Sequence, residues 1–350
     1  MPSPSCLAPN RPQGGHSALF QIAAFLYFFL PPLFFYFGAS SFALGVAIAS
    51  AFPIYAQLSS DVRSHQVIPR VRSLLPWGGL VFGFLLAHLA LASLGQPFYW
   101  MRSLASMGLL MSILLSAGIL SSWLSRVPDL IIYRSICAVA VTLVLLVPWS
   151  LAGSQPASIK QFIRPVFPFT EPSHWALSTI PVLLFLCVVS RGWHRTAFLM
   201  MAMVLPILVQ NLTLLAGVLI ILALSMPLRY AVPMIFIEIY ATVFSNTRQK
   251  TFHLDRLGGV VSEATANLSA LVYRQGWETM GHTLISTKGW GVGFQQLGLQ
   301  PISTESTMAI QKIIPGGLNL MDGGFVLAKL VSEFGFFGIF LTLVKPLQNP

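Results

Sequence analysis

The side chains that could do chemistry are concentrated in one part of this chain, roughly residues 246–318. That stretch collects cations, carboxylates and histidines, namely Arg248, Lys250, Arg256, Arg274, Lys288, Lys312, Asp255, Glu263, Glu278, Glu305, His253 and His282. Guanidinium and ammonium groups bind phosphate, whereas carboxylates and imidazoles accept or donate protons. Elsewhere the chain consists of apolar segments joined by short turns. We therefore expect its chemistry in residues 246–318.

The elements that position these side chains are predicted to be membrane helices. Hydrophobic residues make up 55% of the 350 residues, charged residues only 9%, and the mean hydropathy is +0.75. Soluble domains carry about 25% charged residues. The apolar runs are about 15 to 25 residues long and continuous, which suits helices across a roughly 30 Å hydrocarbon core and not the alternating strands of a barrel. The sequence predicts an all-α integral membrane protein.

Ten spans are predicted, at residues 18–37, 39–58, 74–94, 103–123, 132–151, 175–190, 196–210, 212–227, 230–245 and 320–344. Residues 1–17 form a polar tail, and the first apolar run is interpreted as a retained span because no small-residue cleavage site follows it. Residues 18–245 contain the first nine spans, residues 246–318 form one large loop, and residues 319–350 contain the last span and the C-terminus. Pro206, Gln210 and Asn211 predict a tight hairpin or a broken helix between the seventh and eighth spans.

The distribution of basic residues predicts the orientation. One side of the ten-span arrangement receives Arg11, Arg63, Arg70, Arg72, Arg126, Arg134, Arg191, Arg195, Arg229 and Lys345 in short segments. The short loops of the other side hold only Arg102, Lys160 and Arg164. Because short cytoplasmic loops are enriched in Lys and Arg, both termini are predicted to be cytoplasmic and the large loop to face outward.

Neither the net charge nor the cysteines indicate a further function. The net charge of +10 is spread over many short loops, which is typical of topology signals and of attraction to anionic lipid or substrate, so no nucleic-acid partner is expected. Cys6, Cys137 and Cys187 form no disulfide or metal motif.

The most patterned part of the large loop is residues 273–298. From Arg274 to Lys288 it has helical spacing, with Trp277, Met280, Leu284 and Ile285 on one face. We expect an amphipathic helix on or near the outer membrane surface, ending in a turn that contains Gly289, Gly291 and Gly293. His282 follows Glu278 by four residues, so a local pair between them competes with a catalytic role for His282.

These residues carry a resemblance to a known family. An Arg followed three residues later by a Trp, a helix, the turn GWGVGF and a later span reading SEFGFFGIF resemble the shared core of the O-antigen polymerases and O-antigen ligases. The matching positions are Arg274, Trp277, Gly289, Gly291, Gly293, Phe294, Leu327, Leu330, Glu333, Gly335 and Gly338. The motifs cover residues 273–341, and the rest of the chain agrees only in hydropathy.

The resemblance implies glycosyl transfer at the periplasmic face of the bacterial inner membrane, from a glycan carried on undecaprenyl diphosphate, without metal or other cofactor. A polymerase moves the growing glycan onto the next lipid-linked repeat unit, and a ligase moves it onto lipid A-core. The implied partners are the lipid-linked oligosaccharide and membrane lipid, with a chain-length regulator protein also allowed.

The resemblance and the chemistry together select candidate residues. Arg274 is the candidate that stabilises the diphosphate leaving group, and Asp322 and His282 are the candidate acid–base groups. The predicted substrate-binding residues are Arg164, Arg248, Arg256, Lys288 and Glu278. Ligases commonly carry a His just before the last conserved span, where this chain has Asp322, and this departure favours a polymerase.

Two alternatives stay open at this point. A ligase would use the same donor with a different acceptor. A transporter or flippase of a lipid-linked substrate would need no catalytic group, but it would be expected to show inverted repeats and charged residues in both halves of the membrane region. The chain shows no repeat, and its polar residues lie mainly outside the spans. The sequence favours the polymerase.

Overall fold

The computed structural model describes residues 14–39, 41–59, 67–94, 98–151, 166–209, 211–244, 268–299, 302–313 and 323–343. All regular elements within these ranges are helices. Four of the predicted site residues, Arg164, Arg248, Arg256 and Asp322, lie outside the described residues, as does most of the N-terminal tail.

A helix occupies each of the nine ranges predicted as spans between residues 18 and 245. Their bounds are α1 Gly14–Tyr36, α2 Ala43–Ser59, α3 Val67–Ser93, α4 Trp100–Leu124, α5 Asp129–Leu151, α6 Pro172–Val189, α7 Gly192–Val209, α8 Leu212–Ser225 and α9 Leu228–Phe244. The predicted break between the seventh and eighth spans is confirmed. There α7 ends at Val209, and the side chain of Asn211 caps α8 by accepting a hydrogen bond from the N–H of Leu214 at 3.0 Å.

Six helices of the described chain are long and apolar enough to cross a membrane, at residues 15–36, 75–93, 100–124, 129–150, 172–189 and 192–209. Helices α2 and α8 are apolar but shorter. Only 22% to 39% of the most apolar window of each of the six long helices is buried, as expected for helices that face lipid. The chain is therefore an all-α membrane protein.

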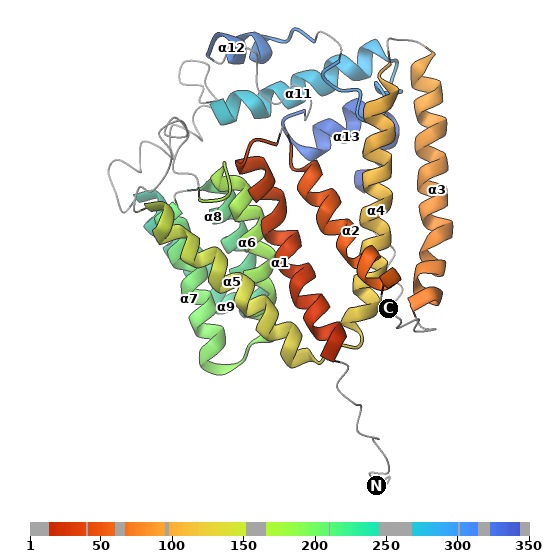
Figure 1. The fold of residues 1–350 in the computed structure, drawn as a ribbon. Helices are drawn as coiled ribbons and strands as arrows, with labels where there is room; N and C mark the ends of the chain where they lie inside the picture. Colours follow the sequence, from red (N-terminus) through yellow and green to blue (C-terminus); the bar gives the residue numbers. More distant parts are fainter. Residues whose placement is uncertain are drawn as a thin grey trace. The chain divides into compact units, whose positions relative to one another are not determined.

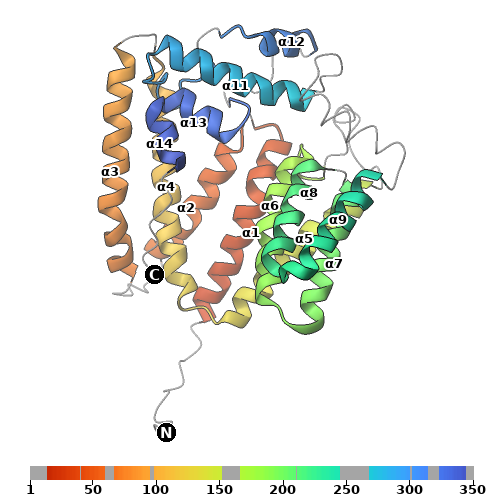
Figure 2. The same cartoon turned by 180° about the vertical axis from the view of Figure 1, so that it is seen from behind.

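The chain divides into two compact units. Unit 1 comprises residues 1–74 and 112–245. Its largest core is formed by α5 to α8, the yellow-green and green helices of Figure 2, around buried Leu143, Leu183, Leu186 and Leu222. The indole N–H of buried Trp175 donates to the backbone carbonyl of Leu143 at 3.1 Å, which satisfies its only polar atom inside this core.

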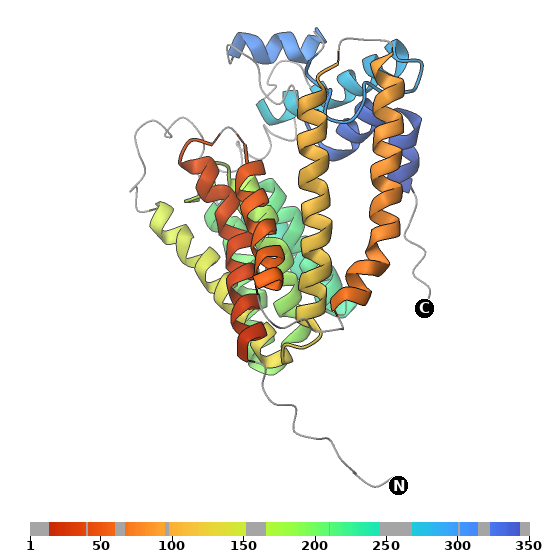
Figure 3. The same cartoon turned by 45° about the vertical axis from the view of Figure 1, so that its right-hand side comes forward.

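Unit 2 comprises residues 75–111 and 246–350, and it contains the part of the chain to which the sequence assigns chemistry. Besides α3 and the first half of α4, it holds α11 Leu268–Ser286, α12 Glu305–Ile313, α13 Val326–Phe334 and α14 Phe336–Leu343. Helix α11 runs across α3 and α4 and not alongside them (Figure 1). Helix α14 lies beside α3 (Figure 3). The rings of Phe84 on α3 and Phe337 on α14 are 5.8 Å apart.

The predicted tenth span, at residues 320–344, is not one helix. It consists of the 9-residue α13 and the 8-residue α14, separated by Gly335 with φ of +61°. A span needs about 20 residues, so neither helix crosses a bilayer alone, and the prediction of ten spans is wrong at this position. Gly335 ends α13 in a backbone conformation that other residues rarely adopt, which hydropathy does not reveal.

Candidate functional site

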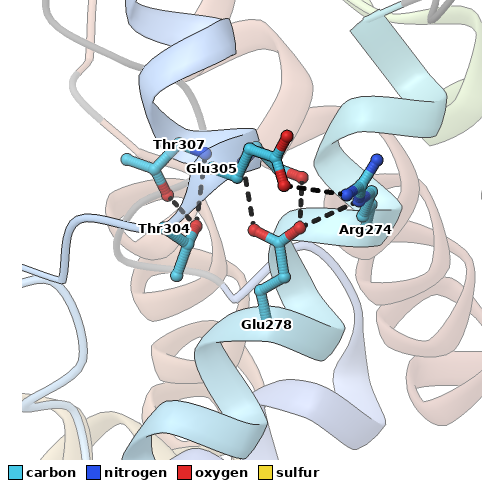
Figure 4. Close-up of polar contacts among 6 residues, drawn as sticks. Arg274, Glu278, Thr304, Glu305 and Thr307 are labelled. Carbon is cyan, nitrogen blue, oxygen red and sulfur yellow. Dashed lines mark hydrogen bonds and ion pairs between the residues drawn. The ribbon is translucent and has the colours of Figure 1, made fainter. Parts of the chain in front are cut away.

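A helix, α11, occupies the range in which the amphipathic helix is predicted, and Arg274 lies on its exposed side. The guanidinium of Arg274 bonds two carboxylates, with its Nε 2.9 Å from Oε1 of Glu278 and a terminal nitrogen 3.0 Å from Oε2 of Glu305. Glu278 is one turn away on α11, whereas Glu305 is the first residue of α12. Figure 4 shows the three side chains converging between the two helices. We call Arg274, Glu278 and Glu305 the charge cluster.

Glu278 holds the N-terminus of α12 against α11. Its carboxylate accepts hydrogen bonds from the backbone N–H of Ser306 at 3.0 Å and from the Ser306 hydroxyl at 2.8 Å. The hydroxyl of Thr304 accepts from the N–H of Thr307 at 3.2 Å. The first N–H groups of a helix have no partner within the helix, so these two side chains provide the missing acceptors.

The same contacts determine the ionisation of Glu278. Burial alone would raise the pKa of this carboxyl group. Hydrogen bonds from the backbone and hydroxyl of Ser306, a hydrogen bond from Thr304 and the charge of Arg274 outweigh burial, and the net effect lowers the pKa of Glu278 from its ordinary value. A carboxylate stabilised in its charged form is a weak general base, so the contacts of Glu278 suit it to anchoring.

The face of α11 that packs is not the apolar face predicted from the sequence. Its buried residues are Leu271, Val272, Gln275, Gly276, Thr279 and Thr283. Trp277 and Ile285 are exposed instead, to 41% and 83%. Gly276 permits the close approach, because a Cβ atom there would stand 2.6 Å from the carbonyl oxygen of Gly323. The inner face thus combines apolar Leu271 and Val272 with small and polar residues, while Trp277 and Ile285 of the predicted apolar stripe lie outside.

The glycine turn after α11 packs against the junction of α13 and α14. Gly289, Gly291 and Gly293 all have positive φ, and Cβ atoms at Gly289 and Gly291 would collide with Phe336 and with the carbonyl of Glu333. Backbone hydrogen bonds join the two segments, from Gly293 to Glu333 at 2.9 Å and from Phe336 to Gly289 at 2.9 Å. The turn N–H groups of Gly293 and its neighbour Val292 therefore bond protein carbonyls, which favours a structural turn over a phosphate cradle.

The segment after the glycine turn is clamped to the start of α4 by residues that sequence reasoning missed. Gln296 is 3% exposed. Its side chain bonds both the N–H and the carbonyl of Tyr99, at 2.9 and 3.2 Å, and the hydroxyl of Ser103 at 2.6 Å. The Ser103 hydroxyl donates to the carbonyl of Phe294 at 2.7 Å. No spacing rule links positions 190 residues apart, so the sequence carried no usable signal for this clamp.

A second contact secures the turn from α3. His88 is 4% exposed, and its Nε2–H donates to the carbonyl of Trp290 at 3.0 Å. The two residues line a small hollow with Leu91 and Ala92. His88 was also missed, because an isolated histidine in an apolar run has no distinguishing pattern.

The remaining described candidates, His282 and Lys288, are exposed. The predicted pair between His282 and Glu278 is not formed, because Glu278 bonds Arg274 and Ser306 instead. Lys288 stands just after α11 with φ of +53°. The structure brings together Arg274 and Glu278 from the predicted set, and it adds Glu305, which occupies the second side of the guanidinium.

The charge cluster can bind anions only by rearranging, since one guanidinium between two ionised carboxylates leaves a net negative charge. Glu305 is the more exposed partner, with a side chain 70% exposed against 23% for Glu278. Exposed ion pairs contribute roughly 0–1 kcal/mol, so a phosphate group could displace Glu305 at small cost. Within the described residues, no group of three or more potential metal ligands occurs.

No protein-family model, curated protein or solved structure matches this chain.

Proposed function

We propose that this protein is a membrane-embedded glycosyltransferase that polymerises a bacterial surface polysaccharide such as O-antigen or capsule. Its donor is a growing glycan on undecaprenyl diphosphate, and its acceptor is the next lipid-linked repeat unit. In this proposal the protein lies in the inner membrane, with both termini cytoplasmic and α11 and α12 at the periplasmic face.

The observation that carries the proposal is the packing of the two segments on which the resemblance depends. Gly289 and Gly291 in the first segment fit directly against Phe336 and Glu333 in the second. Residues separated by about forty positions thus act as one structural unit. The spacing of the glycines is explained by that fit, which an accidental run of glycines in an apolar chain would not provide.

The role proposed for Arg274 is to bind the diphosphate leaving group. The guanidinium is exposed to 43% and offers a planar, charge-assisted donor set, which suits phosphate oxygens. Glu278 holds the guanidinium in position through its 2.9 Å contact, while exposed Glu305 is the partner that the diphosphate replaces. Asp322 is retained as the candidate base, and Lys288, Arg164, Arg248 and Arg256 as candidates that add positive charge.

The test is the polysaccharide ladder on a gel after deletion of the gene and re-supply of variants. Deletion should leave lipid A-core with a single repeat unit, and Arg274→Ala should lower polymer formation by roughly 10²-fold, the usual effect of removing one charged donor to a leaving group. Bare core with polymer retained on the lipid carrier would identify a ligase. A normal ladder after deletion would refute transfer altogether.

Glu305→Gln is the matched control. Both Arg274→Ala and Glu305→Gln remove the ion pair between Arg274 and Glu305, but only the first removes the guanidinium. If Arg274 serves the donor, Glu305→Gln keeps the ladder or strengthens donor binding, since it removes the competing anion. Equal loss of the ladder in both variants would mean that Arg274 acts only by holding α12.

A further inference from the structure

Unit 2 exposes an aromatic surface next to the charge cluster. The ring of Phe325, the residue before α13, stacks on Tyr273 with centroids 4.9 Å apart and lies 5.2 Å from the ring of Trp277. Tyr273 and Trp277 are themselves 6.1 Å apart, edge to face, and are 44% and 41% exposed. We call Tyr273, Trp277 and Phe325 the aromatic trio. Gly276 makes room for it, because a Cβ atom there would stand 2.6 Å from the Phe325 ring.

The aromatic trio and the charge cluster lie side by side on α11. Successive residues of a helix are separated by about 100°, so the row of Tyr273 and Trp277 neighbours the row of Arg274 and Glu278. Gly281 follows Trp277 by four residues and Glu278 by three, which places it beside both rows. A Cβ atom at Gly281 would have no heavy atom within 4 Å, so the surface there is open.

We propose that this surface binds a neutral sugar ring of the lipid-linked glycan, and this inference rests on the proposed function. A pyranose presents an apolar face of C–H groups and a rim of hydroxyls. The exposed rings of Tyr273 and Trp277, backed by half-buried Phe325, match the apolar face. The carboxylate of Glu305 and the guanidinium of Arg274 match the rim, because they accept and donate hydrogen bonds.

Charge distinguishes a sugar from a lipid headgroup as the occupant. Tyr and Trp also anchor proteins at membrane interfaces, where they neighbour lipid phosphates. Here, however, two carboxylates stand beside the rings and already pair with the one guanidinium, so a phosphate binds only after it displaces Glu305, whereas a neutral sugar needs no such displacement. The hydroxyls of a neutral sugar carry no charge and donate hydrogen bonds to carboxylates, so they are favoured at this place.

The test measures binding without turnover. The full-length protein is placed in phosphatidylcholine nanodiscs and mixed with the oligosaccharide that mild acid releases from the host's own surface polysaccharide. Saturation-transfer NMR should show contact between the protein and the C–H protons of a sugar. Trp277→Ala should weaken this binding at least fivefold, whereas Trp277→Phe should retain most of it. Trp193→Ala, at a 73% exposed Trp of unit 1, is the matched control and should bind like wild type.

Gly281→Gln provides a second variant that does not depend on the integrity of the trio. It adds bulk in open space on an exposed helix surface, so it should block the sugar and leave the fold intact. Wild-type oligosaccharide binding by both Trp277→Ala and Gly281→Gln would overturn the proposal. So would a larger loss of affinity in Trp277→Ala for phosphatidylglycerol vesicles than for the oligosaccharide. Such a result, combined with loss of the ladder in Arg274→Ala, would leave the proposed transferase function standing without this sugar site. Oligosaccharide binding together with a normal ladder after gene deletion would leave the sugar site standing without the proposed transferase function.

Discussion

At the scale of single residues, Glu278 has the most clearly defined role. Its carboxylate receives hydrogen bonds from Ser306 and an ion pair from Arg274, so it stabilises the packing of α12 on α11 in its charged form. The sequence assigned Glu278 to substrate binding, but its oxygens are engaged by the protein itself. Glu305, which bonds Arg274 through an exposed ion pair, is the better candidate to exchange partners during a reaction.

The lowered pKa of Glu278 predicts an acid-sensitive stability. A carboxyl group whose pKa is lower in the folded state contributes stability above its unfolded pKa, near 4.5, and loses it as the pH falls through the folded value. The thermal stability of the wild type should therefore fall below about pH 4.5 more steeply than that of Glu278→Gln, which has no charge to lose. Unfolding of both proteins in detergent, followed by intrinsic fluorescence at several pH values, measures this. Parallel curves for the two would show that the charge of Glu278 contributes nothing.

At the scale of elements, the glycine turn and the α13–α14 junction depend on each other. The turn can approach the end of α13 only because Gly291 lacks a Cβ atom and has φ of +78°. The result is a backbone contact between two segments that both belong to the resemblance. A Cβ atom at position 291 would collide with backbone atoms of Glu333 and Gly335. Movement of a side chain therefore cannot relieve the collision.

Gly291→Ala should therefore destabilise unit 2 by more than about 1 kcal/mol, because alanine fits neither the conformation nor the space. Gly281→Ala is the control within α11. There a Cβ atom meets nothing, and alanine in a helix interior is expected to stabilise by about 0.5–1 kcal/mol. Melting temperatures in detergent compare the two variants. If Gly291→Ala melts no earlier than Gly281→Ala, the turn is not held as the structure indicates.

At the scale of the whole molecule, the outstanding question is which part faces which side of the membrane. The distribution of basic residues predicts that α11 and α12 face the periplasm and that the loop at Arg191 faces the cytoplasm. In a background with Cys6, Cys137 and Cys187 replaced by serine, Lys288→Cys should react with a membrane-impermeant maleimide in cells with a permeabilised outer membrane. Arg191→Cys should react only after the inner membrane is lysed. Both positions are exposed, so reversed labelling would invert the orientation.

Much of this protein was determined by its sequence alone. Nine helices occupy the predicted span ranges, and α11 and the glycine turn lie where the sequence predicts a helix and a turn. Both kinds of prediction succeed because helix formation and membrane insertion depend on local hydropathy and backbone preference. The hairpin break at Asn211 was also readable, since a polar capping residue between two apolar runs is a local signal.

Only the tertiary structure decided the break at Gly335, the inner face of α11 and the partners of Arg274. Apolar residues continue on both sides of Gly335, so hydropathy could not separate two short helices from one span. The packed face of α11 contains small and polar residues beside Leu271 and Val272, because its neighbours approach through Gly276 and hydrogen-bond through Gln275. Glu305, 31 residues beyond Arg274, reaches it only because α12 folds back onto α11, a long-range contact that no local pattern encodes.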